Sequence, residues 1–184
     1  MAIWAFDLDG TLCEAWYGEN NPDFYNNNED QTIRSLLTDC YEYVKPLPYI
    51  NTFLRSISQW DNDPVLAVIS RICNGTELPQ KINFLQENFK MADGTPYFNH
   101  GHIFGVVNDE DKIHILRYLQ VKQGKLPPTQ TFYFDDNLSL IHRLYKECRE
   151  EKIKVFHSSS LAVRTPYDIM TACDPPLIAI PKIN

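Results

Sequence analysis

The feature that most constrains the fold is a repeated alternation of short apolar segments with longer segments of helical periodicity. Five apolar segments are predicted strands, at residues 2–7, 64–70, 102–107, 131–135 and 152–157. Four longer segments are predicted helices, at residues 49–60, 77–89, 110–122 and 138–151. Such an alternation forms a parallel sheet covered on both faces, because each crossover helix must pack against the sheet. The sequence therefore predicts an α/β fold, a three-layer Rossmann-like parallel sheet of about five strands.

The side chains within these segments fit the same prediction. The run VLAVI at residues 65–69 suits a strand that is buried on both faces. Two predicted helices carry an apolar stripe, made of Ile115, Leu116 and Leu119 in one and of Leu140, Ile141, Leu144 and Cys148 in the other.

Two regions depart from the alternation. Residues 12–45 form a long insertion, whose second half, TIRSLLTDCYEYV, is predicted to be a short amphipathic helix or part of a hairpin. Residues 158–184 are rich in Pro and show little periodicity. A chain of 184 residues is long enough for one domain with a sizeable core, so we expect a single domain over residues 1–184.

Charge and cysteine usage narrow the environment and the partners. The chain has 17 Lys and Arg against 24 Asp and Glu, a net charge of −7, which disfavours nucleic acid as the main partner. Its 5 cysteines are scattered without CxxC spacing, which argues against a disulfide framework or a zinc site and favours a reducing compartment. The start, MAIWAFDLDGT, does not read as an ordinary signal peptide, which leaves export by another route open. No apolar stretch reaches the roughly 18 residues of a spanning helix, so no transmembrane segment is predicted.

Polar side chains gather at the predicted carboxyl ends of the strands, where open parallel sheets bind ligands. Asp7 and Asp9 follow the first strand, Ser70 ends the second, and Asp135 and Asp136 end the fourth. A single Asp in such a place is as often an N-cap or turn residue. Four carboxylates in one crevice, however, repel each other unless a cation is present, and oxygen ligands of this kind suit Mg²⁺.

The segment FDLDGTL at residues 6–12 resembles the first motif, DxDGT, of the haloacid dehalogenase (HAD) superfamily. Its other three motifs have matches in the same order, over roughly residues 3–156: Ser70 at the end of VLAVIS, Lys112 in NDEDKIHIL, and Asp135 and Asp136 in FYFDDN. Lys125 is the alternative for the site lysine. The resemblance implies an Mg²⁺-dependent phosphatase that forms a phospho-aspartyl intermediate.

The resemblance also implies a role for each matching residue. Asp7 would be the nucleophile and Asp9 the general acid and base, while Lys112 would neutralise the negative charge of nucleophile and phosphate. Mg²⁺ would be held by Asp7, the backbone carbonyl of Asp9, Asp135 and Asp136. Phosphoryl oxygens would be bound by Ser70 and by backbone N–H groups after Asp9, at Gly10 and Thr11. Arg71 is expected either to reach the substrate or to form a surface ion pair.

Substrate class depends on the insertion, because members of this superfamily take much of their specificity from caps. Residues 12–45 leave room only for a small cap or flap, so we expect an open crevice that admits a phosphorylated protein, in particular phosphotyrosine. A small phosphorylated metabolite and nucleic-acid ends are the alternatives, as is a non-catalytic binding module. Four aromatic residues of the insertion, Trp16, Tyr17, Phe24 and Tyr25, are expected to line the entrance or to pack on the core. The pair His100 and His102 is read as part of a loop rather than as metal ligands.

Overall fold

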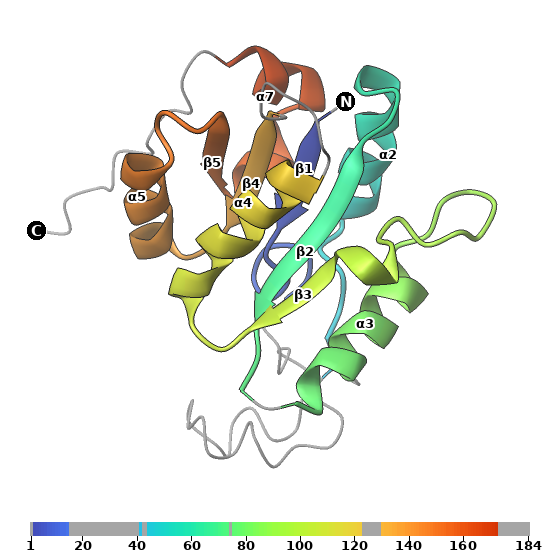
Figure 1. Cartoon of the computed structure of the whole chain (residues 1–184). Helices are drawn as coiled ribbons and strands as arrows, with labels where there is room; N and C mark the ends of the chain where they lie inside the picture. The colour runs from blue at the N-terminus through green and yellow to red at the C-terminus, as the bar shows by residue number, and fades with distance from the viewer. Residues whose placement is uncertain (1, 15–40, 42–43, 74, 123–129, 173–184) are drawn as a thin grey trace, which may run out of the picture.

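A computed structural model describes residues 2–14, 41, 44–73, 75–122 and 130–172 of the chain. It contains one sheet of five parallel strands in the order β3-β2-β1-β4-β5, which confirms the predicted fold class (Figure 1). The strands are β1 (Ile3–Phe6), β2 (Val65–Arg71), β3 (Ile103–Val106), β4 (Thr131–Asp135) and β5 (Ile153–His157).

Helices cover the sheet on both faces, as the alternation predicts. The longer helices are α2 (Ile50–Trp60), α3 (Glu77–Asn88), α4 (Lys112–Lys122) and α5 (Leu138–Glu147). Two short helices follow β5, α6 (Ser160–Val163) and α7 (Pro166–Thr171), and two 3-10 turns, η1 (His100–His102) and η2 (Asp109–Asp111), flank β3. The side chains of α2, α3, α6 and α7 pack on one face of the sheet, and those of α4 and α5 pack on the other.

The strands supply both cores because their side chains alternate. Trp4 and Phe6 of β1 point to the α2 face, whereas Ile3 and Ala5 point to the α4 face. On the α2 face the core is aromatic: the Phe6 ring stacks on Phe134 of β4 with ring centroids 5.1 Å apart. All four residues of β1 are fully buried, so the first strand forms the centre of the molecule.

One buried carboxylate has a structural role at the amino ends of the strands. Asp61, which follows α2, is 3% exposed. Its Oδ2 accepts hydrogen bonds from the backbone N–H of Ala2 (2.7 Å) and from Trp4 Nε1 (3.3 Å). Asp61 therefore anchors the start of β1 to the end of α2.

Two details differ from the predictions made on periodicity. In α4 the buried apolar positions are Ile113, Leu116 and Leu119, while Ile115 is only partly buried at the edge of the core. The segment after β5, where little periodicity is visible, forms α6 and α7. Thr165 begins α7 with a capping box that it shares with Asp168, so local capping rather than an apolar stripe defines this helix.

Part of the predicted insertion falls on residues 15–40 and 42–43, which lie outside the described residues together with the tail after residue 172. The four aromatic residues at positions 16, 17, 24 and 25, and Lys125, are among them. In the part of the chain that is described, no helix has the length and apolarity needed to cross a membrane.

Candidate active site

The topology gathers the polar residues at one edge of the sheet. The chain builds outward from β1 through β2 to β3, and then returns to the other side of β1 to form β4. The crossovers therefore diverge between β1 and β4, which is the position where open α/β sheets form a ligand crevice. Asp7 directly follows β1, Ser70 lies near the end of β2, and Asp135 ends β4.

Three carboxylates from these strand ends form one cluster. Asp7, Asp135 and Asp136 can each offer a ligand oxygen, and these oxygens all lie within 4.8 Å of one another. Asp7 is 6% exposed and Asp135 is 1% exposed. Burial raises the pKa of the Asp7 carboxyl to about 8; Lys112 opposes this rise, and the charges of Asp135 and Asp9 add to it. Burial, and then the charge of Asp135, also raises the pKa of Asp136.

Lys112 bridges two of these carboxylates from the first turn of α4. Its buried ammonium donates to Asp7 Oδ1 at 3.0 Å and to Asp135 Oδ2 at 2.9 Å, and it lies 3.3 Å from Asp109 Oδ1. Burial alone would lower the pKa of this amine, but the charges of Asp7 and Asp135 outweigh burial and raise it. Lys112 is therefore held as a cation between the ends of β1 and β4.

Asp135 is the most constrained carboxylate of the cluster. Besides Lys112, the hydroxyl of Tyr133 donates to its Oδ2, and the backbone N–H of Asn137 donates to its Oδ1 at 2.8 Å. Burial and then the charge of Asp135 keep the pKa of Tyr133 well above its usual value, so the phenol remains a donor. The sequence reasoning did not identify Tyr133, which lies two residues before Asp135 on the same side of β4.

Gly10 allows the chain to turn back directly beside Asp136. Its φ of +77° lies in the left-handed region that glycine adopts without strain. A Cβ atom at this position would lie 2.3 Å from Asp136 Oδ2. Two observations favour glycine at this position: the positive φ, and the short distance that a Cβ atom would have to Asp136 Oδ2.

Asp9 points to a second set of partners. Its Oδ2 lies 2.6 Å from Lys81 Nζ and 3.4 Å from the Ser70 hydroxyl, and its Oδ1 accepts a 2.7 Å hydrogen bond from Tyr41. Burial and then the charge of Asp9 raise the pKa of Tyr41 well above its usual value. The site thus has two lysine-centred groups, one around Asp7 and one around Asp9.

Lys81 is the main site residue that the sequence reasoning missed. It lies on the buried side of α3, where Glu77, Ile82 and Leu85 are also buried. A lysine in register with apolar positions of a helix is the signal that could have revealed it, since buried lysines are rare unless they are paired.

The predicted phosphate-binding N–H groups are engaged inside the turn. The N–H of Gly10 donates to the Cys13 carbonyl at 3.0 Å, and that of Thr11 donates to the Leu8 carbonyl at 3.2 Å. The Thr11 hydroxyl is fully buried and has no hydrogen-bond partner among the described residues. Gly10 and Thr11 thus lie beside the site as part of this turn, and the turn uses their N–H groups in its own hydrogen bonds.

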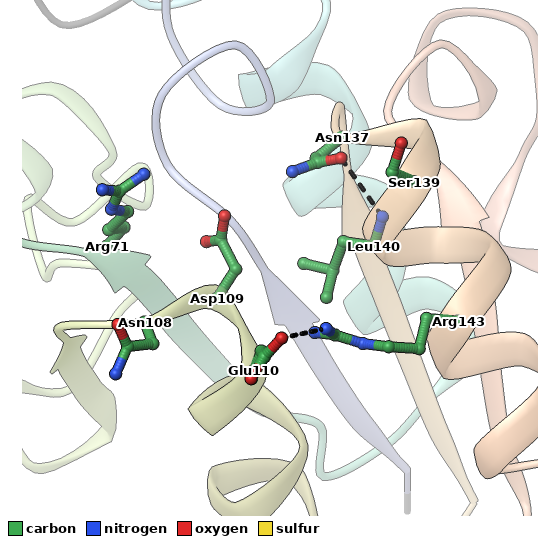
Figure 2. A pocket seen from close by; sticks show the side chains of 8 residues that line it. All are labelled: Arg71, Asn108, Asp109, Glu110, Asn137, Ser139, Leu140 and Arg143. Atoms are coloured by element: carbon green, nitrogen blue, oxygen red, sulfur yellow. Dashed lines mark hydrogen bonds and ion pairs between the residues drawn. The ribbon is translucent and has the colours of Figure 1, made fainter.

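A polar cavity of about 460 Å³ has lining residues next in sequence to the site residues Ser70 and Asp136, although none of the three clustered carboxylates lines it. Its lining residues come from the end of β2, from η2 with the residue before it, and from α5 with the residue before it: Arg71, Asn108, Asp109, Glu110, Asn137, Ser139, Leu140 and Arg143. Figure 2 shows Arg71 across the cavity from Asn137 and Ser139, while Arg143 is paired with Glu110 at 2.6 Å. Arg71 lines this cavity, and its side chain forms no ion pair within the described residues.

The carboxylate cluster fits a divalent cation by its chemistry. All its ligand atoms are oxygens; burial raises the pKa of Asp7 and Asp136, and the repulsion between neighbouring carboxylates adds to the rise. A hard cation such as Mg²⁺ would relieve that repulsion. The Asp9 carboxylate is not part of this group of three and contacts Lys81 instead, while the ligand expected from Asp9 is its backbone carbonyl. His100 and His102 lie in η1, and neither belongs to a metal-ligand group among the described residues.

Comparison of the chain with protein-family models, with curated proteins and with solved structures gives no match. The assignment of a function therefore rests on the geometry and chemistry of the site.

Proposed function

We propose that this protein is a Mg²⁺-dependent phosphomonoester hydrolase of the HAD type, with Asp7 as the nucleophile. The observation that carries the proposal is the cluster of Asp7, Asp135 and Asp136 between β1 and β4, in which Lys112 bridges Asp7 and Asp135. A binding module would have no need for a buried, crowded carboxylate at this point, because such a group destabilises the fold.

The first half of the reaction transfers the phosphoryl group to the protein. An oxygen of Asp7 attacks phosphorus while the bond from phosphorus to the leaving oxygen breaks, which gives an aspartyl-phosphate. Asp9 is ion-paired with Lys81 in the structure, so its carboxyl must take up a proton in the substrate complex. It then gives this proton to the leaving oxygen, and the alcohol departs. Lys112 supports this step because its ammonium, 3.0 Å from Asp7 Oδ1, offsets the charge of the incoming phosphate.

The second half regenerates the carboxylate. Water attacks the phosphorus of the aspartyl-phosphate, the Asp9 carboxylate takes a proton from that water, and the bond from phosphorus to the Asp7 oxygen breaks. Inorganic phosphate leaves, and both carboxyls return to their starting states.

Asp7, Asp135 and Asp136 would hold the Mg²⁺ ion. When bound, the ion neutralises charge on the phosphoryl oxygens and orients the group for in-line attack. The hydroxyl of Ser70, 1% exposed at the end of β2, would donate to a phosphoryl oxygen.

A direct experiment tests the reaction. The purified protein should hydrolyse an aryl phosphate when Mg²⁺ is supplied and lose that activity in excess chelator. The variant Asp7→Asn should lose activity by several orders of magnitude, beyond the roughly 10²–10⁴-fold expected for one acid–base group. Beryllium fluoride, which mimics an acyl phosphate, should bind at Asp7. Full activity in chelator, or a fluoride adduct elsewhere, would contradict the mechanism.

For substrate class we propose a phosphorylated protein, with phosphotyrosine preferred, as follows from the small insertion in the sequence. A phosphotyrosine side chain is long enough to bring its phosphate to a recessed carboxylate, whereas phosphoserine requires the peptide backbone to approach closely. Phosphotyrosyl peptides should therefore have a higher kcat/KM than phosphoserine peptides or sugar phosphates.

One observation favours a second candidate, a small phosphorylated metabolite. The cavity that Arg71 and Asn137 help to line has the size of a small-molecule site and a mostly polar lining. If a sugar phosphate or nucleotide is hydrolysed far faster than any phosphopeptide, this cavity is the substrate site and the phosphoprotein proposal is wrong. Substituting Arg71 with Met should then raise KM for the metabolite.

A further inference from the structure

Lys81 is a buried cation at the site for which the reaction described above gives no role. It is 0% exposed, although lysine is among the residues that are most rarely buried. Its Nζ lies 2.6 Å from Asp9 Oδ2, 2.7 Å from Ser70 Oγ and 2.7 Å from the Arg71 carbonyl. Asp9 and Ser70 belong to the candidate site, and Arg71 directly follows Ser70 in the chain.

The surroundings of Lys81 hold its ammonium in one place. Glu77, one turn earlier on α3 and 1% exposed, lies 3.3 Å away through Oε1. The other oxygen of Glu77 accepts from the backbone N–H of Cys73 at 2.7 Å, which ties the start of α3 to the end of β2. An ammonium is stable in such a place only because it is paired and its donors are used. The lysine is therefore a fixed part of the site rather than a mobile surface charge.

The contacts of Lys81 determine how two other side chains are oriented. The Asp9 carboxyl is held at both oxygens, by Lys81 at Oδ2 and by Tyr41 at Oδ1. An ammonium can only donate, so the Ser70 oxygen accepts from Lys81 and its hydrogen must point to another acceptor. Asp9 Oδ2 at 3.4 Å or a phosphoryl oxygen can serve as that acceptor.

Lys112 and Lys81 contact different groups of the site. Lys112 contacts Asp7 and Asp135, the attacking group and a carboxylate of the metal cluster. Lys81 contacts Asp9 and Ser70, the groups assigned to the leaving oxygen and to the phosphoryl oxygens. We infer that Lys81 is a positioning residue that fixes the Asp9 carboxyl and the Ser70 hydroxyl for phosphoryl transfer. The inference rests on the function proposed above.

If Lys81 acts through Asp9, its loss should matter most when the leaving group needs a proton. The experiment compares kcat/KM for para-nitrophenyl phosphate, whose leaving group departs as a stable anion, with kcat/KM for an alkyl phosphate, whose leaving group must be protonated. In Lys81→Met, which keeps the length of the side chain and removes the charge, we expect a fall of about 100-fold for the alkyl phosphate and at most about 10-fold for the aryl phosphate. Lys81→Arg, which retains a cation, should restore part of the alkyl activity.

A double variant separates positioning from a general effect on the fold. In an Asp9→Asn background, Lys81→Met should not increase the preference for the aryl phosphate any further, because the group through which it acts is already lost. Lys90→Met removes an exposed lysine just beyond α3 and should leave both substrates unaffected. Asp61→Asn, which perturbs a buried carboxylate at the opposite ends of the strands, should not change the ratio between the substrates.

The outcomes are distinct. Equal losses on the two substrates, or an added preference in the Asp9→Asn background, would overturn the role of Lys81 while leaving the phosphatase assignment intact. If Lys81→Met does not fold, as judged by circular dichroism, Lys81→Gln takes its place because it keeps a donor. Failure of both variants to fold would show that the lysine is structural and overturn the inference. A wild-type protein that hydrolyses no phosphomonoester would contradict the proposed function itself.

Discussion

The surroundings of Asp7 act on its carboxylate in opposite directions, because burial and like charges disfavour the charged form whereas Lys112 favours it. Asp7 directly follows the central strand, where it is buried, and it shares its surroundings with other carboxylates and with Lys112. The raised pKa of its carboxyl shows that burial and like charges outweigh the attraction of the lysine. In the absence of a metal ion, this residue costs the folded state stability, as is common for groups whose first role is chemical.

This conflict predicts how stability depends on pH. The folded-state pKa of Asp7 is about 8 against an ordinary value of 3.8, so between these values the folded state binds more protons than the unfolded state. The free energy of unfolding of the metal-free protein should therefore fall as pH rises through that window. Asp7→Asn should remove this fall and be more stable near the upper limit by on the order of 1 kcal/mol.

Denaturant unfolding in excess chelator, repeated across the window, measures this effect. Asp63→Asn, at an exposed carboxylate, is the control and should follow the wild type. A wild type that does not lose stability relative to Asp7→Asn as pH rises would show that Asp7 is not strained by its surroundings.

Gly10 provides a second prediction at the residue scale, with a matched control within the same chain. Gly10 and Gly94 both have positive φ, of +77° and +86°, so an Ala at either position should cost roughly 1–2 kcal/mol in backbone strain. Only at Gly10 would the new Cβ meet Asp136, since nothing lies within 4 Å of a Cβ at Gly94. Gly10→Ala should also raise the Mg²⁺ concentration for half-maximal activity by about 10–100-fold. Equal Mg²⁺ dependence in the two variants would refute the role of the close approach.

At the scale of elements, the two ends of the strands have different tasks. The carboxyl ends carry the crowded charges, whereas the amino ends are held by hydrogen bonds that Asp61 accepts from Ala2 and Trp4. The crowded carboxylates and the hydrogen bonds of Asp61 thus lie at opposite edges of one sheet, so that the effects of substitutions at the two edges can be measured separately.

Asp61→Ala tests this separation. The change leaves two buried donors without their partner, one of them the N–H at the start of β1, so we expect a loss of roughly 2–3 kcal/mol in the free energy of unfolding. Below the melting transition kcat/KM should be unchanged, because the site lies at the other ends of the strands. Asp63→Ala, two residues on and exposed, should change neither quantity. A large fall in kcat/KM for the folded Asp61→Ala protein would show that the two edges are coupled.

At the scale of the whole molecule, a bound cation should couple the strands that contribute its ligands. Asp7 comes from β1, while Asp135 and Asp136 come from β4 and the residue after it, so an ion would join segments that are 128 residues apart in the chain. A ligand that binds only the folded state stabilises it by about 2.7 kcal/mol at 100 times its dissociation constant.

Thermal unfolding with and without Mg²⁺ therefore gives a test that does not depend on catalysis. The wild-type melting temperature should rise with Mg²⁺ and return to its starting value with chelator, and this rise should disappear in Asp135→Asn. Asp109→Asn is the matched control, because Asp109 also pairs with Lys112 but lies outside the ligand group, and it should keep the rise. An equal rise in Asp135→Asn would show that the ion binds elsewhere.

The sequence by itself determined the fold class and the strand ends at which the polar residues lie. Apolar strands that alternate with amphipathic helices are a local pattern, and the carboxyl end of each strand can be read from it. The segments predicted to be β2, β4 and β5 therefore agree with the structure to within a residue or so at each end. Asp7, Asp9, Ser70, Asp135 and Asp136 could be named because each lies at or near a strand end.

Only the tertiary structure decided which of these groups face each other. It pairs the Asp9 carboxyl with Lys81, a lysine 72 residues further along the chain, and it brings Tyr41 to the other oxygen of the same carboxyl. A periodic pattern shows which side of a helix faces the core, but it does not show which polar group that side contacts. The pairing of Lys81 with Asp9 could therefore not be predicted from the sequence. Pairing of this kind depends on the strand order β3-β2-β1-β4-β5 and on how α3 packs beneath it, and those are properties of the folded chain.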